Sequence, residues 1–226
     1  MGTALTIVME RLTWEEMIAQ EPWSFLMFLL AAVMAYLLGC SNGAVIISKY
    51  ILHDDVRTHG SGNAGLTNFF RTFGGVWTFG VILIDVLKAV LAVLFAQWVI
   101  GPMVFAKYWA ASFCLLGHMF PVMFGFKGGK GILSGGTIAL MLNWKLALLV
   151  WGSFLIPAAV TRYVSLGSVL AAAAFPVGTW LFVSHDPVIM AFAAFLGILV
   201  IWMHRGNIKR LLKGEENRLS FHKKKP

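Results

Sequence analysis

Apolar residues in this chain gather in long runs that are separated by short polar segments. The runs cover residues 23–47, 76–100, 107–123, 131–143, 145–160, 165–183 and 187–203. A helix of roughly 20 apolar residues crosses the hydrocarbon core of a bilayer, which is about 30 Å thick. Because the runs are uninterrupted and do not form the single apolar stripe of an amphipathic helix, the pattern predicts an all-α integral membrane protein with about seven transmembrane helices.

The weakest boundary in this pattern lies at Asn143, Trp144 and Lys145, which only briefly interrupt the apolar sequence. Six helices, or a re-entrant element near 128–143, are therefore alternatives. No soluble domain, internal repeat or low-complexity linker is visible in the sequence. We expect a single membrane-embedded domain over 1–226, with an N-terminal extension at 1–21 and a basic cytoplasmic tail at 204–226.

Composition agrees with a membrane protein. Hydrophobic residues make up 59% of the 226 residues and charged residues 12%, against about a quarter charged in soluble domains. The first 21 residues carry four glutamates and one arginine, which favours a short, partly amphipathic helix over a cleaved signal peptide. Cys40 and Cys114 lie in apolar segments without metal-ligand spacing, so we interpret them as buried free thiols.

Lysine and arginine are unequally distributed between the two sides that seven spans would create. The side of the N-terminus has Arg11, Lys107 and Lys145. The other side has fourteen, namely Lys49, Arg57, Arg71, Lys127, Lys130, Arg162 and eight residues from Arg205 to Lys225. Because basic residues stay in the cytoplasm, this predicts an N-terminus outside and a cytoplasmic C-terminus. The net charge of +8 thus indicates an anchor at anionic lipid and not a nucleic-acid partner.

The first predicted cytoplasmic loop reads GSGNAGLTN over 60–68 and continues to Arg71. Its three glycines allow tight turns that point backbone N–H groups at a bound anion. Ser61, Thr67 and Asn68 add side-chain donors, and Arg71 can bind a phosphate through two nitrogens at once. A flexible polar turn between two helices is the alternative that the glycines alone do not exclude.

The second loop reads KGGKG over 127–131 and leads directly into an apolar run. Lys127 and Lys130 flank a glycine pair, so that point charges, a backbone nest and a helix N-terminus coincide, each of which favours phosphate. The spacing is not that of a P-loop, and no strand precedes it. A cytoplasmic anchor would explain the lysines but not the glycines, so we interpret the segment as a phosphate-binding loop.

Two further polar segments fall on the same predicted side. RYVSLGS over 162–168 begins the sixth run, and HRGNIKRLLKGEEN over 204–217 leaves the seventh. Each alone is interpreted as a helix end with anchoring charges, but together they add hydroxyls, a histidine and an amide to the two glycine loops. Asp85 and Lys88 stand inside the second run, where they either pair with each other or help to shape the site. His118 is interpreted as a packed histidine and not as a catalyst.

These four segments together resemble the PlsY family of membrane glycerol-3-phosphate acyltransferases. The resemblance extends from about residue 24 to residue 220 and includes ILIDVLK at 82–88. It implies an enzyme of phospholipid biosynthesis in the bacterial cytoplasmic membrane. Such an enzyme transfers the acyl group of an acyl-phosphate to the 1-hydroxyl of glycerol 3-phosphate and releases lysophosphatidic acid and phosphate. No cofactor and no metal are implied. The expected partners are membrane lipids and the enzyme that synthesises acyl-phosphate.

The resemblance also implies roles for individual residues. The expected catalytic residues are Ser61, Arg71, Lys130, His204 and Asn207. The expected substrate-binding residues are Gly60, Gly62, Asn63, Thr67, Asn68, Lys127, Gly128, Gly129, Gly131 and, on the acceptor side, Ser165 and Ser168, one of which is the functional serine. The base for the acceptor hydroxyl is either His204 or a phosphate oxygen of the donor, and we favour the phosphate oxygen.

The chain departs from the family after KGGKG, where Ile132, Leu133 and Ser134 replace the usual small residue and threonine. An acyltransferase that uses acyl-CoA or acyl carrier protein is disfavoured, because no histidine is followed five positions later by an aspartate. A transporter of phosphate-bearing solutes is a second alternative. It is disfavoured because the polar residues cluster on one face and no repeat is visible.

Overall fold

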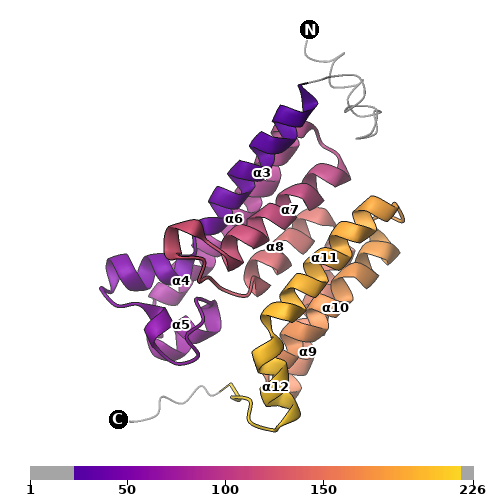
Figure 1. Cartoon of the computed structure of the whole chain (residues 1–226). Helices are drawn as coiled ribbons and strands as arrows, with labels where there is room; N and C mark the ends of the chain where they lie inside the picture. The colour runs from indigo at the N-terminus through magenta and orange to yellow at the C-terminus, as the bar shows by residue number, and fades with distance from the viewer. Residues whose placement is uncertain (1–22, 220–226) are drawn as a thin grey trace. The chain divides into compact units, whose positions relative to one another are not determined.

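The computed structural model describes residues 23–219, in which every regular element is a helix (Figure 1). This confirms the all-α fold class. The described residues divide between Met141 and Leu142 into two compact units, and the single domain expected from the sequence stays a prediction. The amphipathic helix expected in the first 21 residues lies outside the described residues, as does the end of the basic tail at 220–226.

Among its described residues, the first unit contains four helices of more than ten residues, with shorter helices and turns between them. Its elements are α3 (Ser24–Cys40), α4 (Gly43–Ile46), the π-helical turn η1 (Ile47–Ile51), the 3₁₀ turn η2 (Val56–Thr58), α5 (Leu66–Thr72), α6 (Trp77–Ile100), α7 (Val104–Met119), the 3₁₀ turn η3 (Val122–Phe124) and α8 (Ile132–Leu142). Helices α3, α6 and α7 pack against one another. A Cβ atom on Gly39 would collide with the carbonyl oxygen of Cys114, and one on Gly117 with that of Tyr36. Glycine thus lets the backbones of α3 and α7 approach closely, as is common between membrane helices.

The first apolar run does not form one continuous helix, which differs from the span expected over 23–47. Helix α3 ends at Cys40, and α4 with η1 continues after a bend of 45°. Asn42 stabilises the break because its fully buried side chain caps α4, with Oδ1 accepting from the N–H of Val45 at 3.1 Å. Its Nδ2 donates to the carbonyl oxygen of Ala64 at 3.0 Å. Capping and a bond to the first loop therefore replace helix continuity at this point.

The second unit consists of α9 (Trp144–Thr161), α10 (Val164–Phe182), α11 (Pro187–Met203) and α12 (Arg205–Leu212). Asn143 caps α9, because its Oδ1 accepts from the N–H of Lys145 at 2.8 Å. The expected boundary at 143–145 therefore separates two helices. Asp186 caps α11 in the same way, with its Oδ1 accepting from the N–H of Val188 at 2.8 Å. Helix α12 leaves α11 at a bend of 58°.

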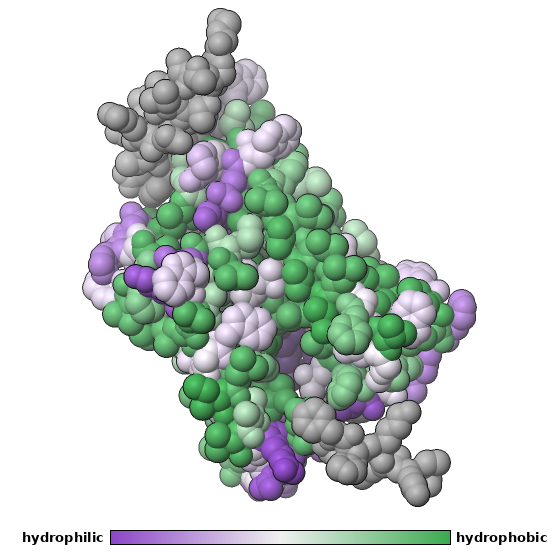
Figure 2. Space-filling view, turned by 180° about the vertical axis from the view of Figure 1, so that it is seen from behind, coloured by the Kyte–Doolittle hydropathy of each residue, from purple (hydrophilic) through white to green (hydrophobic). Residues whose placement is uncertain are grey.

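Three helices of the described residues, α6, α9 and α10, are each long and apolar enough to cross a membrane. The bent pairs α3 with α4–η1 and α11 with α12 bring the number to five if each pair is one span. Each of the seven apolar runs contains a helix, but the number of seven spans stays a prediction. Figure 2 shows hydrophobic side chains over most of the visible face, as expected for helices that face lipid.

Within each unit, the helix ends meet as the predicted topology requires. In the first unit, Nζ of Lys107 donates to the carbonyl oxygen of Met141 at 3.0 Å, which joins two ends expected outside. In the second unit, Nδ2 of Asn143 donates to the carbonyl oxygen of Phe182 at 3.0 Å. These two residues are also at ends expected outside. The side of the membrane that each end faces stays a prediction.

Candidate active site

The buried side chain of Asn68 holds the first glycine loop in shape. Its Nδ2 donates to the carbonyl oxygens of Val56 and His59, each at 3.0 Å, and its Oδ1 accepts from the N–H of Ser61 at 3.0 Å. Gly60 has a φ of 56°, and a Cβ there would collide with Oδ1 of Asn68. Because both N–H donors of the Asn68 amide serve the loop itself, its role here is structural, and its expected contact with substrate stays a prediction.

The first loop leads directly into α5. Thr67 lies in the first turn of this helix and Arg71 in the last, and the side chains of Ser61 and Arg71 are exposed. Asn63 lies beside Gly65, where a Cβ would be 2.6 Å from its Nδ2. The N–H groups of a first helical turn have no partner within the helix. The start of α5, with the exposed Ser61 and Arg71, can therefore offer donors to an anion.

The glycine pair of the second loop packs against the end of α7. The N–H of Gly128 donates to the carbonyl oxygen of Met119, and that of Gly129 to the carbonyl oxygen of His118, both at 3.1 Å. A Cβ on Gly128 would collide with the carbonyl oxygen of His118. The sequence indicated that these N–H groups would face an anion, but they bond to α7 instead. The pair is glycine because the backbones of loop and helix are so close.

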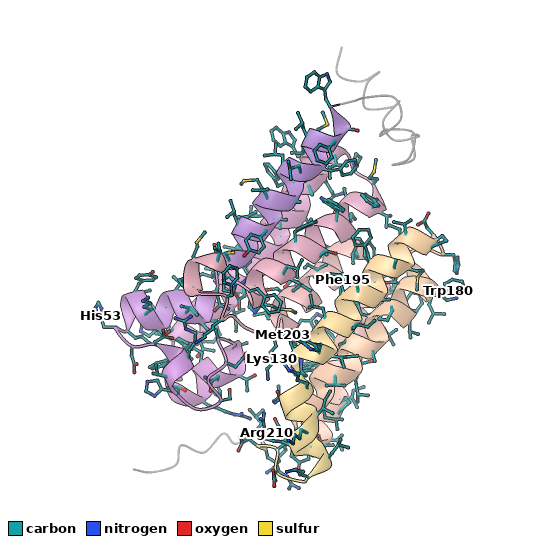
Figure 3. All side chains as sticks on the ribbon, viewed as in Figure 1. His53, Lys130, Trp180, Phe195, Met203 and Arg210 are labelled. Carbon is teal, nitrogen blue, oxygen red and sulfur yellow. The ribbon has the colours of Figure 1, made fainter. Side chains whose placement is uncertain are left out.

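Lys130 and Gly131 stand at the start of α8. Gly131, with a φ of 78°, accepts from the N–H of Gly135 at 2.7 Å and so occupies the capping position. Lys130 is labelled in Figure 3 and is partly buried, whereas Lys127 is exposed. A lysine ammonium beside a helix N-terminus favours a phosphate through both its charge and the N–H groups of the first turn. The phosphate interpretation of this loop therefore rests on Lys130 and the start of α8.

Arg57 joins the two loops. Its Nη2 pairs with Oδ2 of Asp55 at 2.7 Å, and its Nη1 donates to the carbonyl oxygens of Phe124 at 2.8 Å and Lys127 at 3.3 Å. The hydrogen bond between the side chains of Arg57 and Asp55 lowers the pKa of Asp55 and raises that of Arg57. The carbonyl oxygen of Ala64 in the first loop also lies against Gly129 in the second. The first unit therefore brings the two loops together.

The two C-terminal motifs lie together in the second unit. Nε of Arg218 donates to the hydroxyl of Tyr163 at 3.3 Å, and the N–H of Leu219 donates to the carbonyl oxygen of Arg162 at 2.7 Å. Ser165 and Ser168 are buried in the first turns of α10. The Ser168 hydroxyl donates to the carbonyl oxygen of Val164 at 2.9 Å, whereas the Ser165 hydroxyl has no hydrogen-bond partner among the described residues.

His204 stands at the junction of α11 and α12, with its side chain buried. Its Nδ1 lies 2.8 Å from the carbonyl oxygen of Val200. Since a carbonyl oxygen can only accept, Nδ1 is the donor, and a neutral ring then carries its lone pair on Nε2. This tautomer is the one in which Nε2 can accept a proton or a hydrogen bond from an acceptor hydroxyl.

Glu216 organises the polar face of α12. Its Oε1 accepts from Nδ2 of Asn207 at 2.8 Å, and its Oε2 accepts from Nε of Arg210 at 2.7 Å. Burial by itself would raise the pKa of Glu216, but the hydrogen bonds from Asn207 and Arg210 outweigh it, so that the pKa is lowered. The sequence pattern indicates no role for Glu216, although it belongs to the motif over 204–217. Its partners Arg210 and Asn207 are six and nine residues earlier in the chain, across the end of α12, and no periodic pattern identifies them.

The fold and these clusters define an all-helical membrane protein with polar groups at its helix ends. Comparison with known proteins is more specific, because a family model described as glycerol-3-phosphate acyltransferase matches residues 29–214. The chain therefore belongs to the glycerol-3-phosphate acyltransferase family. The resemblance to the PlsY family, inferred from four motifs, is confirmed.

Individual relatives agree with this assignment. The glycerol-3-phosphate acyltransferase of Clostridioides difficile (strain 630) is 40% identical over 203 residues, which cover 87% of this chain and 97% of the relative. That of Thermosynechococcus vestitus is 39% identical and covers 84% of this chain and 94% of the relative.

Two solved structures are also similar. The crystal structure of PlsY (YgiH), an integral membrane glycerol 3-phosphate acyltransferase, in its glycerol 3-phosphate form has a TM-score of 0.78 and 33% identity. The match covers 85% of this chain and 96% of the PlsY chain. The lysophosphatidic acid form has a TM-score of 0.73 and 36% identity, over 85% of this chain and 95% of that chain. This chain is accordingly a multi-pass integral membrane protein.

Proposed function

We propose that this protein transfers the acyl group of an acyl-phosphate to the 1-hydroxyl of glycerol 3-phosphate in the bacterial cytoplasmic membrane, and that it forms lysophosphatidic acid and phosphate. Membership of the glycerol-3-phosphate acyltransferase family supports the class of reaction. The glycerol 3-phosphate and lysophosphatidic acid forms of the similar PlsY structures support the acceptor and the product. A transporter of phosphate-bearing solutes has no support among these relatives.

The observation that carries the proposal is the pair of joined glycine loops in the first unit. Each loop leads directly into a helix N-terminus, and each brings a basic residue, Arg71 in α5 and Lys130 before α8. Arg57 bonds to the backbone between η3 and the second loop, which keeps the two loops together. Two adjacent anion sites suit a reaction in which both substrates carry a phosphate.

The proposed reaction is a direct acyl transfer. The 1-hydroxyl oxygen of glycerol 3-phosphate attacks the acyl carbonyl carbon and forms the new ester bond, while the bond from that carbon to the bridging phosphate oxygen breaks. Phosphate is a good leaving group, so the protein needs chiefly to align two anions and to stabilise developing negative charge. Lys130, Arg71 and the helix starts supply that stabilisation, and Ser61 adds a hydroxyl donor.

His204, Asn207 and a serine of α10 are proposed to bind the acceptor. The hydroxyl proton passes to a phosphate oxygen of the donor and leaves with the phosphate, while His204 binds and orients the acceptor. His204→Asn tests this assignment, because an asparagine amide can still donate to the Val200 carbonyl but lacks Nε2. We expect a rise in KM for glycerol 3-phosphate and a loss of kcat within about tenfold. A general base contributes roughly a hundredfold to ten-thousandfold, so a kcat loss in that range would make His204 the base.

The donor is tested with purified protein in detergent. Acyl-phosphate and glycerol 3-phosphate together should yield one phosphate for each lysophosphatidic acid formed, and acyl-CoA and acyl carrier protein thioesters should yield no product. Robust turnover of a thioester would contradict the donor assignment. An acylated residue trapped with acyl-phosphate alone would contradict direct transfer.

A further inference from the structure

A buried ionic cluster in the first unit takes no part in the proposed reaction. Asp85 and Lys88 lie one turn apart on α6, and His118 lies near the end of α7. Their exposed fractions are 2%, 3% and 3%. Ionisable groups inside a membrane protein are costly and usually serve a function. The sequence left open whether Asp85 and Lys88 simply pair or shape the site, and it did not connect His118 with them.

Lys88 is the centre of this cluster. Its Nζ is 2.7 Å from Oδ1 of Asp85, 3.1 Å from the carbonyl oxygen of Ser41 and 2.6 Å from Nδ1 of His118. An ammonium has three N–H donors and no acceptor, so these three contacts use all of its donors. Because Nδ1 of His118 then accepts, the His118 ring is neutral with its hydrogen on Nε2. The charges of Asp85 and Lys88 cancel, which makes burial of the cluster tolerable.

His118 reaches from this cluster to the second glycine loop. Its carbonyl oxygen accepts from the N–H of Gly129 at 3.1 Å, and its Nε2 lies so close to the Gly129 backbone that a Cβ there would collide with it. On its other side, Gly129 is bounded by the carbonyl oxygen of Ala64. Gly129 precedes Lys130, so the position of the His118 ring helps to set the position of Lys130.

The backbone of α6 beside the cluster also contacts the helix that follows the loop. The Ser134 hydroxyl, in the first turn of α8, donates to the carbonyl oxygen of Asp85 at 3.2 Å. Oδ1 of Asp85 accepts from the N–H of Gly43 at 3.2 Å, at the start of α4. The segment 127–131 is therefore held from α7 on one side and from α6 through α8 on the other. An ion pair that only neutralised two charges would not need the contacts of its side chains with Gly43 and His118.

We infer that Lys88, Asp85 and His118 form a positioning triad for the phosphate-binding loop 127–131. Lys88 orients the His118 ring through Nδ1, the ring holds Gly129, and Gly129 sets the direction of Lys130 and of the start of α8. Because the three side chains are buried, they act through the loop and are positioning residues. The inference rests on the proposed role of Lys130 in binding phosphate.

The first test is a double-mutant cycle. His118→Phe keeps an aromatic ring but removes the Nδ1 acceptor, and we expect kcat/KM to fall by about tenfold to a hundredfold as Lys88 loses a partner. Because His118 acts through the loop of Lys130, the variant that carries both His118→Phe and Lys130→Ala should lose little more activity than Lys130→Ala alone. Trp109→Phe is the matched control on the same helix, since it removes the hydrogen bond from Nε1 of Trp109 to the Phe28 carbonyl oxygen, at 2.9 Å. In the variant that carries both Trp109→Phe and Lys130→Ala, the fold-losses of kcat/KM of the two single variants should multiply.

The second test does not depend on catalysis. Amide hydrogen exchange in the peptide that contains Gly128–Gly131 should be at least about tenfold faster in His118→Phe than in the natural protein, with exchange in α6 unchanged. His118→Asn, whose side-chain oxygen can still accept from Lys88 but which has no ring beside Gly129, should give the same result and replaces the phenylalanine variant if that variant does not insert.

Unchanged exchange, or independent effects of His118→Phe and Lys130→Ala, would overturn the triad. If the natural protein is inactive with acyl-phosphate but exchange is still faster in His118→Phe, the contact between His118 and the loop stands and the proposed function is rejected.

Discussion

At the scale of single residues, several polar side chains serve the backbone of a distant segment. Asn68 bonds to carbonyl oxygens of Val56 and His59, and Arg57 bonds to carbonyl oxygens 67 and 70 residues away. The sequence located both glycine loops, because glycines and basic residues cluster locally. The sequence could not show which hydrogen-bond donors are used within the loops, since tertiary packing alone brings these donors and their acceptors together. For the same reason, the sequence indicated Arg57 only as one of the basic residues on the predicted cytoplasmic side.

Lys130 and Arg71 are expected to contribute directly to turnover. In the proposed site each makes a charge-assisted contact with phosphate, worth roughly 1.5–3 kcal/mol, so Lys130→Ala and Arg71→Ala should each lower kcat/KM by about tenfold to a hundredfold or more. Lys213→Ala is the matched control, because Lys213 is exposed and lies beyond α12, outside the glycine loops. It should retain nearly full activity. Equal losses in all three variants would mean that general surface charge, and not a specific site, explains the effect.

Glu216 is expected to make stability depend on pH. Its pKa in the folded protein lies below its ordinary value of 4.5, so it stabilises the fold above about pH 4.5, and this contribution is lost as the pH falls through the lowered pKa. The thermal midpoint in detergent should therefore fall more between about pH 6.5 and about pH 4 in the natural protein than in Glu216→Gln. Asp55 also has a lowered pKa, but it is present in both proteins and cancels in the comparison. Equal falls would show that Glu216 contributes nothing to this dependence.

At the scale of helices, hydropathy located the elements well and their ends less well. Each of the seven apolar runs contains at least one helix, because only helices satisfy a backbone inside a bilayer. The break after Cys40 was missed, since Asn42 and the glycines beside it are too few to interrupt an apolar run. What stabilises the break is a capping bond within α4 and a bond to Ala64 in the first loop. The boundary at Asn143 was located because an asparagine and a lysine coincide there.

The close packing of α3 on α7 makes Gly117 sensitive to substitution. A Cβ at this position would collide with the carbonyl oxygen of Tyr36 and lie 3.0 Å from the backbone nitrogen of Cys40. Because backbone cannot rotate away as a side chain can, Gly117→Ala should destabilise the protein by about 1–3 kcal/mol. The change is measured as a lower thermal midpoint of the purified protein in detergent.

Gly152 in α9 provides the matched control. A Cβ there would meet nothing within 4 Å, so Gly152→Ala should raise stability by about 0.5–1 kcal/mol through the higher helix propensity of alanine. The two substitutions are chemically identical and differ only in what surrounds the new methyl group. Destabilisation by both to the same extent would mean that helix packing at Gly117 is not the cause.

At the scale of the whole molecule, the sequence grouped its four motifs by counting basic residues, and each unit agrees with part of that grouping. The two glycine loops lie together in the first unit through Arg57. The segments 162–168 and 204–217 lie together in the second, where α10 packs against α12 and Arg218, directly after the second segment, bonds to Tyr163. The pairing within each unit is consistent with the charge count, which follows the side of the membrane and needs no knowledge of packing, while the side itself stays a prediction. The charge count gives no hydrogen-bond partners, which is why the triad of Lys88, Asp85 and His118 could not be derived from it.

The orientation in the membrane gives the last prediction. Single cysteines at Thr58, Lys127 and Lys213 should react with an impermeant thiol reagent only from the cytoplasmic side, because basic residues favour that side for their loops by fourteen to three. A cysteine at His185 should react only from outside, and its neighbour Asp186 is left intact because it caps α11. The native Cys40 and Cys114 are fully buried and should not react in intact cells. Reversal of all four positions would refute the orientation alone. Labelling of the Thr58 and Lys127 positions from opposite sides would contradict the joined loops, because Arg57 bonds across the two segments that carry them.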